Sequence, residues 1–364
     1  MPLAPNSTGA VVHTANQIRV SGALNHYRKP VSILHHMDKL INKEPPNIAI
    51  TRTMGGIGDV LMTLPTVKAI SKKYGVKVTY GTDFNYLDGA LPRVLQHNPY
   101  ISEIVRFQEI EIDNFTAVID LTCPCVVHEQ PLAPPINRID LFARHVRIPL
   151  EDHNIDLVIT DKEKEDARLW IQQNGLAGKK LIMVNATSST SVRDAPRDKQ
   201  IKSLIGLLKE DKNIRIVLVT HGSDHTKTEW RYSEVIQFHN KNTREIAALM
   251  GFTELVMCPD SAILHVAAAL HHKTFTLFGP TDPRARINHH PEAVAIWPTY
   301  NHKNYPSWYK DPGDGYVCWK KLNVDLMTKT MSAMINNLPI PNTGELITFG
   351  FYQREQDQFP SWLR

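Results

Sequence analysis

The chain has 364 residues, more than one hydrophobic core usually holds, so two domains are expected. Hydrophobic residues make up 42% of the chain and charged residues 21%, which is ordinary for a soluble protein. The net charge of +4 suits a small anionic ligand but is too weak to indicate a nucleic-acid or membrane surface.

The sequence also indicates the compartment. Its four cysteines are too few and too irregularly placed for a disulfide framework, which favours a reducing environment. No apolar run approaches the ~18 residues of a membrane span. The N-terminus lacks a basic start followed by an apolar block, so no signal peptide is expected. We therefore expect a cytoplasmic protein, free or held peripherally at the inner membrane face, with no integral membrane association.

Residues 1–45 show weak periodicity and are interpreted as an N-terminal extension. A β-α-β pattern follows them and implies a parallel sheet. Its segments are a buried strand over 47–53, a glycine turn over 55–59, a helix over 60–75, and strands over 76–82 and 117–122. We assign this first domain to residues 46–155.

Strands and helices alternate again after a polar stretch, KEKED at 162–166. The predicted strands cover 181–187, 214–222, 254–258 and 274–279, and the predicted helices cover 200–210, 243–251 and 261–272. This pattern is typical of a second doubly wound α/β domain, which we assign to residues 156–335. Two such domains in tandem predict a cleft between them, and ligands of such sheets bind at the carboxyl ends of the strands.

The first motif that follows a strand is GGIGD. Gly55, Gly56 and Gly58 form a turn that lets the backbone approach a ligand, and Asp59 stands at the start of the next helix. On residue type alone, a helix cap is the simplest interpretation of Asp59. A nicotinamide-binding fingerprint is disfavoured because the third glycine of that motif is absent.

The second motif is the polar run NATSSTSVRDAPRDKQ over 185–200. It offers the hydroxyls of Thr187 and Ser188, and then the cations Arg193, Arg197 and Lys199 just before a predicted helix. Hydroxyls, cations and a helix N-terminus together can bind a diphosphate. A solvated polar loop explains this segment equally well.

The third motif covers two strand ends. Asp260 and Ser261 stand at the start of the predicted helix 261–272, with His265 one turn further along the same face. The next strand ends in GPTDP, where two prolines hold Thr281 and Asp282. Helix capping and a half-buried histidine explain the first group, but GPTDP is more specialised than a generic turn.

Two long segments carry a resemblance. GGIGDVLMTLPTVKAI and PDSAILHVAAALHHKTFTLFGPTDP resemble glycosyltransferase family 9, the bacterial ADP-heptose:lipopolysaccharide heptosyltransferases, and the resemblance spans about residues 47–335. It implies the GT-B fold, two facing Rossmann-like domains with the acceptor mainly on the first and the nucleotide sugar on the second. It also implies that residues 336–364 return toward the first domain.

The resemblance further implies roles for matching residues. Asp59 would be the catalytic base, Lys199 would neutralise the donor phosphates and Asp224 would hold the donor ribose, where the family usually has Glu. Ala262 replaces a usual glycine. The remaining sugar and phosphate contacts would be Asp260, Ser261, His265, Thr281 and Asp282.

The sequence therefore predicts a metal-independent, inverting glycosyltransferase that needs no cofactor and acts on a lipopolysaccharide core or another glycan. It contains no Asp-x-Asp metal motif, and the acidic run at 109–113 has the pattern of a half-exposed strand. Cys123 and Cys125 with His128 do not have a standard zinc spacing. The alternatives are a transferase acting on a modified DNA base, a non-catalytic sugar-nucleotide or glycan-binding protein, and a Rossmann oxidoreductase.

Overall fold

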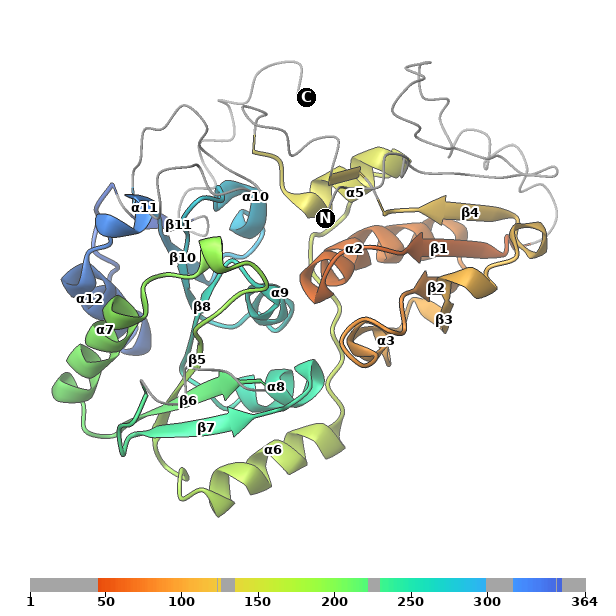
Figure 1. The fold of residues 1–364 in the computed structure, drawn as a ribbon. Coiled ribbons are helices and arrows are strands. Elements are labelled where there is room, and N and C mark those ends of the chain that lie inside the picture. Colours follow the sequence, from red (N-terminus) through yellow and green to blue (C-terminus); the bar gives the residue numbers. More distant parts are fainter. Residues whose placement is uncertain are drawn as a thin grey trace. The chain divides into compact units, whose positions relative to one another are not determined.

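The structure is a computed structural model that describes residues 45–122, 124–125, 135–221, 230–298, 317–344 and 346–348 (Figure 1). The chain divides into two compact units, Met1–Ile159 and Thr160–Arg364. Nearly all of the predicted extension over 1–45 lies outside the described residues.

The described part of the first unit contains a four-stranded parallel sheet in the order β3-β2-β1-β4. Its strands are β1 Ile48–Arg52, β2 Val78–Thr82, β3 Ile101–Arg106 and β4 Ala117–Asp120. The chain runs from β1 outward to β3 and then returns to place β4 on the other side of β1. The strand order therefore reverses between β1 and β4, which is where ligands bind in open α/β sheets.

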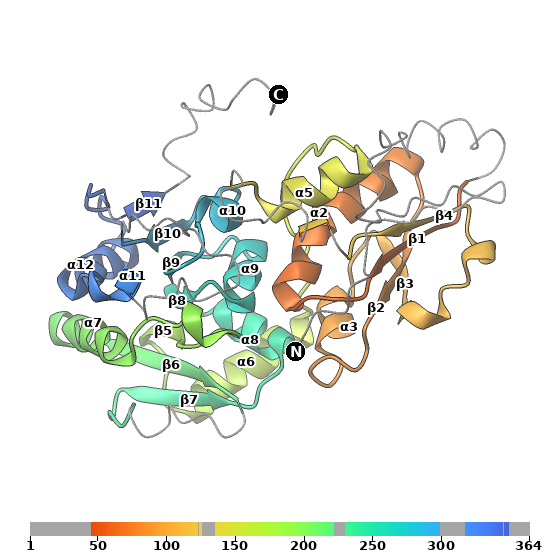
Figure 2. The same ribbon diagram turned by 45° about the horizontal axis from the view of Figure 1, so that its top comes forward.

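The helices of this unit are α2 Ile57–Tyr74, α3 Ala90–Leu95 and α5 Arg138–Val146. Helix α2 ends at Gly75, whose φ of 67° is left-handed and suits glycine. It packs against α5, as both views show (Figures 1 and 2). Long-range packing of this kind joins residues that the sequence separates by about 80 positions.

The half-exposed strand predicted over 109–113 is wrong. The segment instead forms two short 3-10 turns, Phe107–Glu109 and Ile112–Asn114. The Glu109 carboxylate accepts the backbone N–H of Arg106 at 3.2 Å, and Asn114 Nδ2 donates to the Glu111 carboxylate at 2.9 Å. Such local side-chain hydrogen bonds compete with a strand ladder.

The described part of the second unit contains a seven-stranded sheet in the order β11-β10-β9-β8-β5-β6-β7. The strands are β5 Lys180–Asn185, β6 Ile214–Thr220, β7 Val235–His239, β8 Leu255–Pro259, β9 Thr274–Leu277, β10 Ala293–Ile296 and β11 Leu346–Thr348. All neighbours pair in parallel except β10 and β11. The order reverses between β5 and β8, so this sheet also has a switch point.

Helices cover both faces of this sheet, which confirms the doubly wound α/β class. Helices α7, α11 and α12 lie on one face, and α8 and α9 on the other (Figures 1 and 2). The helices are α6 Asp161–Gln173, α7 Arg197–Glu210, α8 Thr243–Met250, α9 Ala262–Ala269, α10 Arg284–Ile287, α11 Val317–Lys320 and α12 Val324–Ile335. A core of buried aliphatic, methionine and aromatic side chains fills the space between helices and sheet.

The C-terminal segment is described only in part. Strand β11 pairs antiparallel with β10, so residues 346–348 belong to the sheet of the second unit. The chain after residue 348 lies outside the described residues, and the return of 336–364 toward the first domain stays a prediction.

Candidate functional site

In the first unit, Asp59 is positioned by the glycine turn after β1. Its Oδ2 accepts the backbone N–H of Gly56 at 2.9 Å, which confirms the helix-cap interpretation. Gly55 has a φ of 102°, and a Cβ on it would lie 2.6 Å from Asp59 Oδ2. The turn therefore needs glycine at this position for conformation and for space. Gly58 lies buried in the first turn of α2.

Two arginines hold the Asp59 carboxylate. Arg138 on α5 forms an ion pair with Oδ1, and Arg52 Nη2 lies 3.7 Å from the same oxygen. The side chains of Arg52 and Arg138 are only 4% and 9% exposed, against 16% for Asp59. Arg52 also lies over the Phe142 ring, 5.0 Å from its centre. The arrangement stabilises the charged carboxylate of Asp59, the most accessible group of the three.

Sequence reasoning missed both arginines. Arg138 stands 79 positions after Asp59, and no local pattern connects the two residues. Arg52 could have been suspected of an ion pair, because a charged residue at the end of a buried strand needs a partner.

Tyr86 is a third residue that the sequence did not point out. Its hydroxyl would lie 3.4 Å from a Cβ placed on Gly56, so it faces the glycine turn. Burial and the negative charge of Asp59 raise the pKa of Tyr86, which keeps the phenol protonated and able to donate. This hydroxyl makes no hydrogen bond to any residue that the structure describes.

In the second unit, several of the predicted donor residues lie in loops at the switch point. The loops that follow β5, β8 and β9 leave the carboxyl ends of three adjacent strands. Asp260 follows β8 and is 2% exposed. One of its oxygens accepts from Arg193 Nη1 at 3.2 Å, and the other lies 3.6 Å from Arg286 Nε. Sequence reasoning missed Arg286, because nothing near it in the sequence distinguishes this buried residue from an arginine on the surface.

Ser261 occupies the N-cap position of α9, but its hydroxyl makes no capping hydrogen bond. Asn185 Nδ2 donates to Ser261 Oγ at 3.2 Å and to the Thr187 carbonyl at 2.7 Å, which links the β8 and β5 loops. His265 is 4% exposed within α9, more buried than the half-buried histidine that the sequence suggested. The structure thus joins the β5 and β8 loops through Asn185 and Ser261 and through Arg193 and Asp260, and the binding of a donor by these residues stays a prediction.

The polar loop after β5 is held by its own side chains. The Asp194 carboxylate accepts the Ser188 backbone N–H at 2.6 Å, and Ser188 Oγ donates to the Thr190 carbonyl at 2.7 Å. Burial raises the pKa of Asp194. Arg193 Nη2 donates to Ser189 Oγ at 3.1 Å, so the guanidinium that contacts Asp260 is fixed from the loop side as well.

The GPTDP loop after β9 buries its polar pair. Asp282 is fully buried and accepts from the backbone N–H and the guanidinium of Arg284, at 2.8 and 2.6 Å. Thr281 is 1% exposed, and its Oγ1 has no hydrogen-bond partner among the described residues. A buried hydroxyl with no partner in the protein is uncommon and suits contact with a ligand.

Lys199 is engaged elsewhere. Its Nζ donates to the carbonyls of Trp319, Lys320 and Leu322 at 2.9, 2.9 and 2.8 Å. A lysine has three N–H donors, so these contacts use all of them. Asp224 lies outside the described residues.

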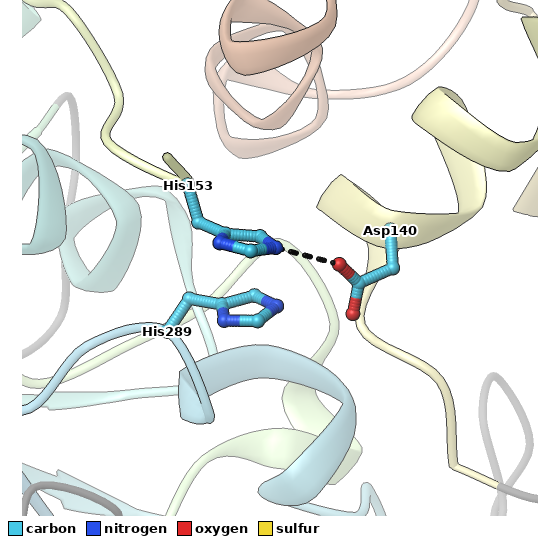
Figure 3. A group of neighbouring side chains, drawn as sticks. All are labelled: Asp140, His153 and His289. Atoms are coloured by element: carbon cyan, nitrogen blue, oxygen red, sulfur yellow. Dashed lines mark ion pairs between the residues drawn. The ribbon is translucent and has the colours of Figure 1, made fainter. Parts of the chain in front are cut away.

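The sequence candidates for a metal are not tested, because Cys123 and His128 lie outside the described residues. Within the first unit, His153 Nε2 lies 3.1 Å from Asp140 Oδ1 (Figure 3). Zinc sites in proteins use three or four protein ligands, so this pair alone assigns no zinc. No helix in the described part of the chain is long and apolar enough to cross a membrane.

Comparisons with known proteins agree with this architecture. Residues 128–307 match the model of Glycosyltransferase family 9 (heptosyltransferase). A glycosyl transferase family 9 structure from Veillonella parvula is 16% identical, with a TM-score of 0.63 over 82% of this chain and 99% of that one. The E. coli heptosyltransferase WaaC with ADP is 15% identical, with a TM-score of 0.55 over 79% of this chain and 99% of that one.

A third similar structure is the dodecameric iron-containing heptosyltransferase TibC, from enterotoxigenic E. coli, in complex with ADP-D-beta-D-heptose. It is 11% identical, with a TM-score of 0.58 over 91% of this chain and 92% of that one. No curated protein sequence matches the chain. At these identities the structures establish the GT-B fold, and residues 128–307, just under half of the chain, resemble the glycosyltransferase family 9 (heptosyltransferase) model.

Proposed function

We propose that the chain transfers a sugar from a nucleoside-diphosphate sugar, ADP-heptose or a close relative, to a hydroxyl of a glycan such as a lipopolysaccharide core. The observation that carries this proposal is the Asp260 cluster at the switch point of the second sheet. It combines a buried acid, a partly exposed arginine and the buried hydroxyl of Thr281, all in loops at the carboxyl ends of neighbouring strands. The structures solved with ADP and ADP-D-beta-D-heptose support an adenine nucleotide as the donor carrier.

The donor diphosphate requires positive charge as it leaves. The side chain of Arg193 is 20% exposed and anchored on Asp260, so its orientation is fixed before the ligand arrives. Helix α9 begins at Ala262, two residues after Asp260, and directs its positive end to the same loop. These groups can stabilise the leaving diphosphate without a metal ion, and metal independence is part of the proposal.

Asp59 is proposed as the general base. An acceptor hydroxyl must lose its proton as it attacks the sugar carbon, and a positioned carboxylate can accept that proton. Arg52 and Arg138 keep Asp59 charged, and its 16% exposure leaves it accessible to an acceptor. Direct attack with one base predicts inversion at the sugar carbon. Donor binding then depends on residues of the second unit, whereas turnover depends on both units.

The test is calorimetric titration with ADP, UDP, GDP and CDP, with and without EDTA. It is run on the wild type, on Asp260→Ala and on Asp211→Ala, an acid of the same unit that pairs with Lys180 at 2.9 Å. We expect ADP to bind best, EDTA to change nothing, and only Asp260→Ala to lose affinity.

Loss of binding on chelation would refute metal independence, and failure of every nucleotide to bind would refute the transferase itself. Binding without turnover on any glycan would favour the non-catalytic binding protein considered from the sequence. The acceptor alternative of a modified DNA base has no support in the comparisons and is not proposed.

A further inference from the structure

Lys199 lies at the centre of a set of contacts that joins three segments of the second unit. Its ammonium group donates to the carbonyls of Trp319, Lys320 and Leu322, at the end of helix α11 and just after it. Carbonyls in the last turn of a helix lack intrahelical partners and carry partial negative charge. Two of the three carbonyls, those of Trp319 and Lys320, belong to α11, so Lys199 caps the end of this helix and also holds the residue Leu322 that follows it.

The capped segment positions Trp319 against the donor loops. The Trp319 side chain is 1% exposed, and a Cβ on Gly279 would lie 2.6 Å from its Cε2. The indole therefore packs directly on the backbone of the GPTDP loop. Its Nε1 also donates to the Val192 carbonyl at 3.4 Å, in the loop that carries Arg193.

Gln200, the neighbour of Lys199 on α7, holds the same loop from the other side. Its Nε2 donates to the carbonyls of Ala186 and Ala195 at 3.2 and 2.8 Å, and the residue is 1% exposed. The start of α7 thus fixes the polar loop through Gln200 and the end of α11 through Lys199.

We propose that Lys199 is a positioning residue that fixes, through Trp319, the two loops carrying Arg193 and Thr281, and that it does not bind the donor phosphates. The inference rests on the proposed donor site, but it reverses the role that the resemblance gave to Lys199. Binding a diphosphate would require the ammonium to leave three carbonyls at 2.8 to 2.9 Å. Arg193 supplies the cation instead, because its guanidinium is already held at the loop.

The test is a double-mutant cycle on the full chain with Lys199→Met, Trp319→Phe and both together. Lys202→Met is the matched control, since Lys202 lies on the same helix and, within the described part of the chain, pairs with the exposed Asp198 alone, at 3.1 Å. Thermal unfolding is measured without ligand, and ADP binding is measured by calorimetry. Lys199→Arg keeps the positive charge, but its planar fork cannot direct donors to three converging carbonyls.

We expect Lys199→Met and Trp319→Phe each to lower the Tm by about 3 to 8 °C and to weaken ADP binding about tenfold. The double variant should lose less than the sum of the two, because both changes release the same loops. Lys199→Arg should be as defective as Lys199→Met, and Lys202→Met should behave as wild type.

The inference is overturned if Lys199→Met weakens ADP binding at an unchanged Tm, if its effect adds fully to that of Trp319→Phe, or if Lys199→Arg restores binding. It is equally overturned if the Tm falls and ADP affinity does not. A wild type that fails to bind ADP would refute the proposed function instead. The cycle of Tm values without ligand would still decide whether Lys199 and Trp319 act together.

Discussion

Replacing Gly279 with alanine tests how tightly the GPTDP loop is packed. A methyl group there would lie 2.6 Å from Trp319 Cε2, closer still to Cζ2, and 3.0 Å from Cη2. Carbon atoms at such distances repel strongly, and the indole is 1% exposed, so it has little room to move. Either the ring or the GPTDP loop must shift.

The magnitude follows from overpacking of a filled core. Inserting a methylene-sized group into such a core costs typically 1–3 kcal/mol. Contact with several atoms of a rigid ring places Gly279→Ala in the upper part of that range, at about 2–3 kcal/mol. For a unit of roughly 200 residues this corresponds to a fall in Tm of about 4 to 12 °C. Because the loop carries Thr281, ADP affinity should fall with it.

The assay is thermal unfolding by circular dichroism, with ADP binding measured in parallel. Gly251→Ala is the control, because a Cβ there meets only the Ala248 carbonyl at 3.5 Å, an ordinary contact. At such a site alanine is neutral or stabilises by about 0.4–1 kcal/mol. Equal Tm values for the two variants would show that Trp319 does not pack on Gly279 and would refute the reasoning.

Three further predictions concern the first unit and the pH response. Asp59→Asn should lower turnover about 10²- to 10⁴-fold in a product-release assay, with the ADP dissociation constant unchanged. Tyr86→Phe should raise the KM for the acceptor several-fold in initial-rate measurements and leave ADP binding as it is, since the lost hydroxyl faces the glycine turn. The hydrogen bonds from Arg244 lower the pKa of Glu163 from 4.5 to about 2. Because the folded state depresses this pKa, the stabilisation is present above pH 4.5 and is lost as the pH falls toward 2, so urea unfolding at pH 6 and pH 3 should differ less in Glu163→Gln than in wild type.

Local patterns predicted the scaffold well because the determinants of each element are adjacent in the sequence. The buried-strand pattern NIAITRT over 47–53 predicted β1, and Gly251 correctly ended the helix that begins at Thr243. The polar cluster around Asp260 was predicted because its strand ends are neighbours in a parallel sheet. The alternation of acidic residues and isoleucine at 109–113 wrongly predicted a strand, because the acidic side chains there accept hydrogen bonds from nearby backbone and side-chain groups.

The partners of the two acids could not be predicted in the same way. Arg138 reaches Asp59 only because α5 packs on α2, and Arg286 reaches Asp260 from the short helix that follows GPTDP. The side-chain direction of a long arginine depends on tertiary packing, which periodicity does not encode. Lys199 illustrates the same limit: its carbonyl partners lie in and just after α11, a four-residue helix for which the sequence gave no signal.

Both units contain a carboxylate that is paired with two arginines, but the two carboxylates differ in exposure. Each unit places an acid at the switch point of its sheet and flanks it with two arginines, because a desolvated carboxylate is costly without paired charge. The Asp260 side chain is 3% exposed and pairs with the more accessible Arg193, which suits the proposed role of orienting this arginine toward a ligand. The Asp59 side chain is 16% exposed and can meet an acceptor hydroxyl directly. This difference in exposure is the physical reason why we propose proton transfer for Asp59 and donor organisation for Asp260.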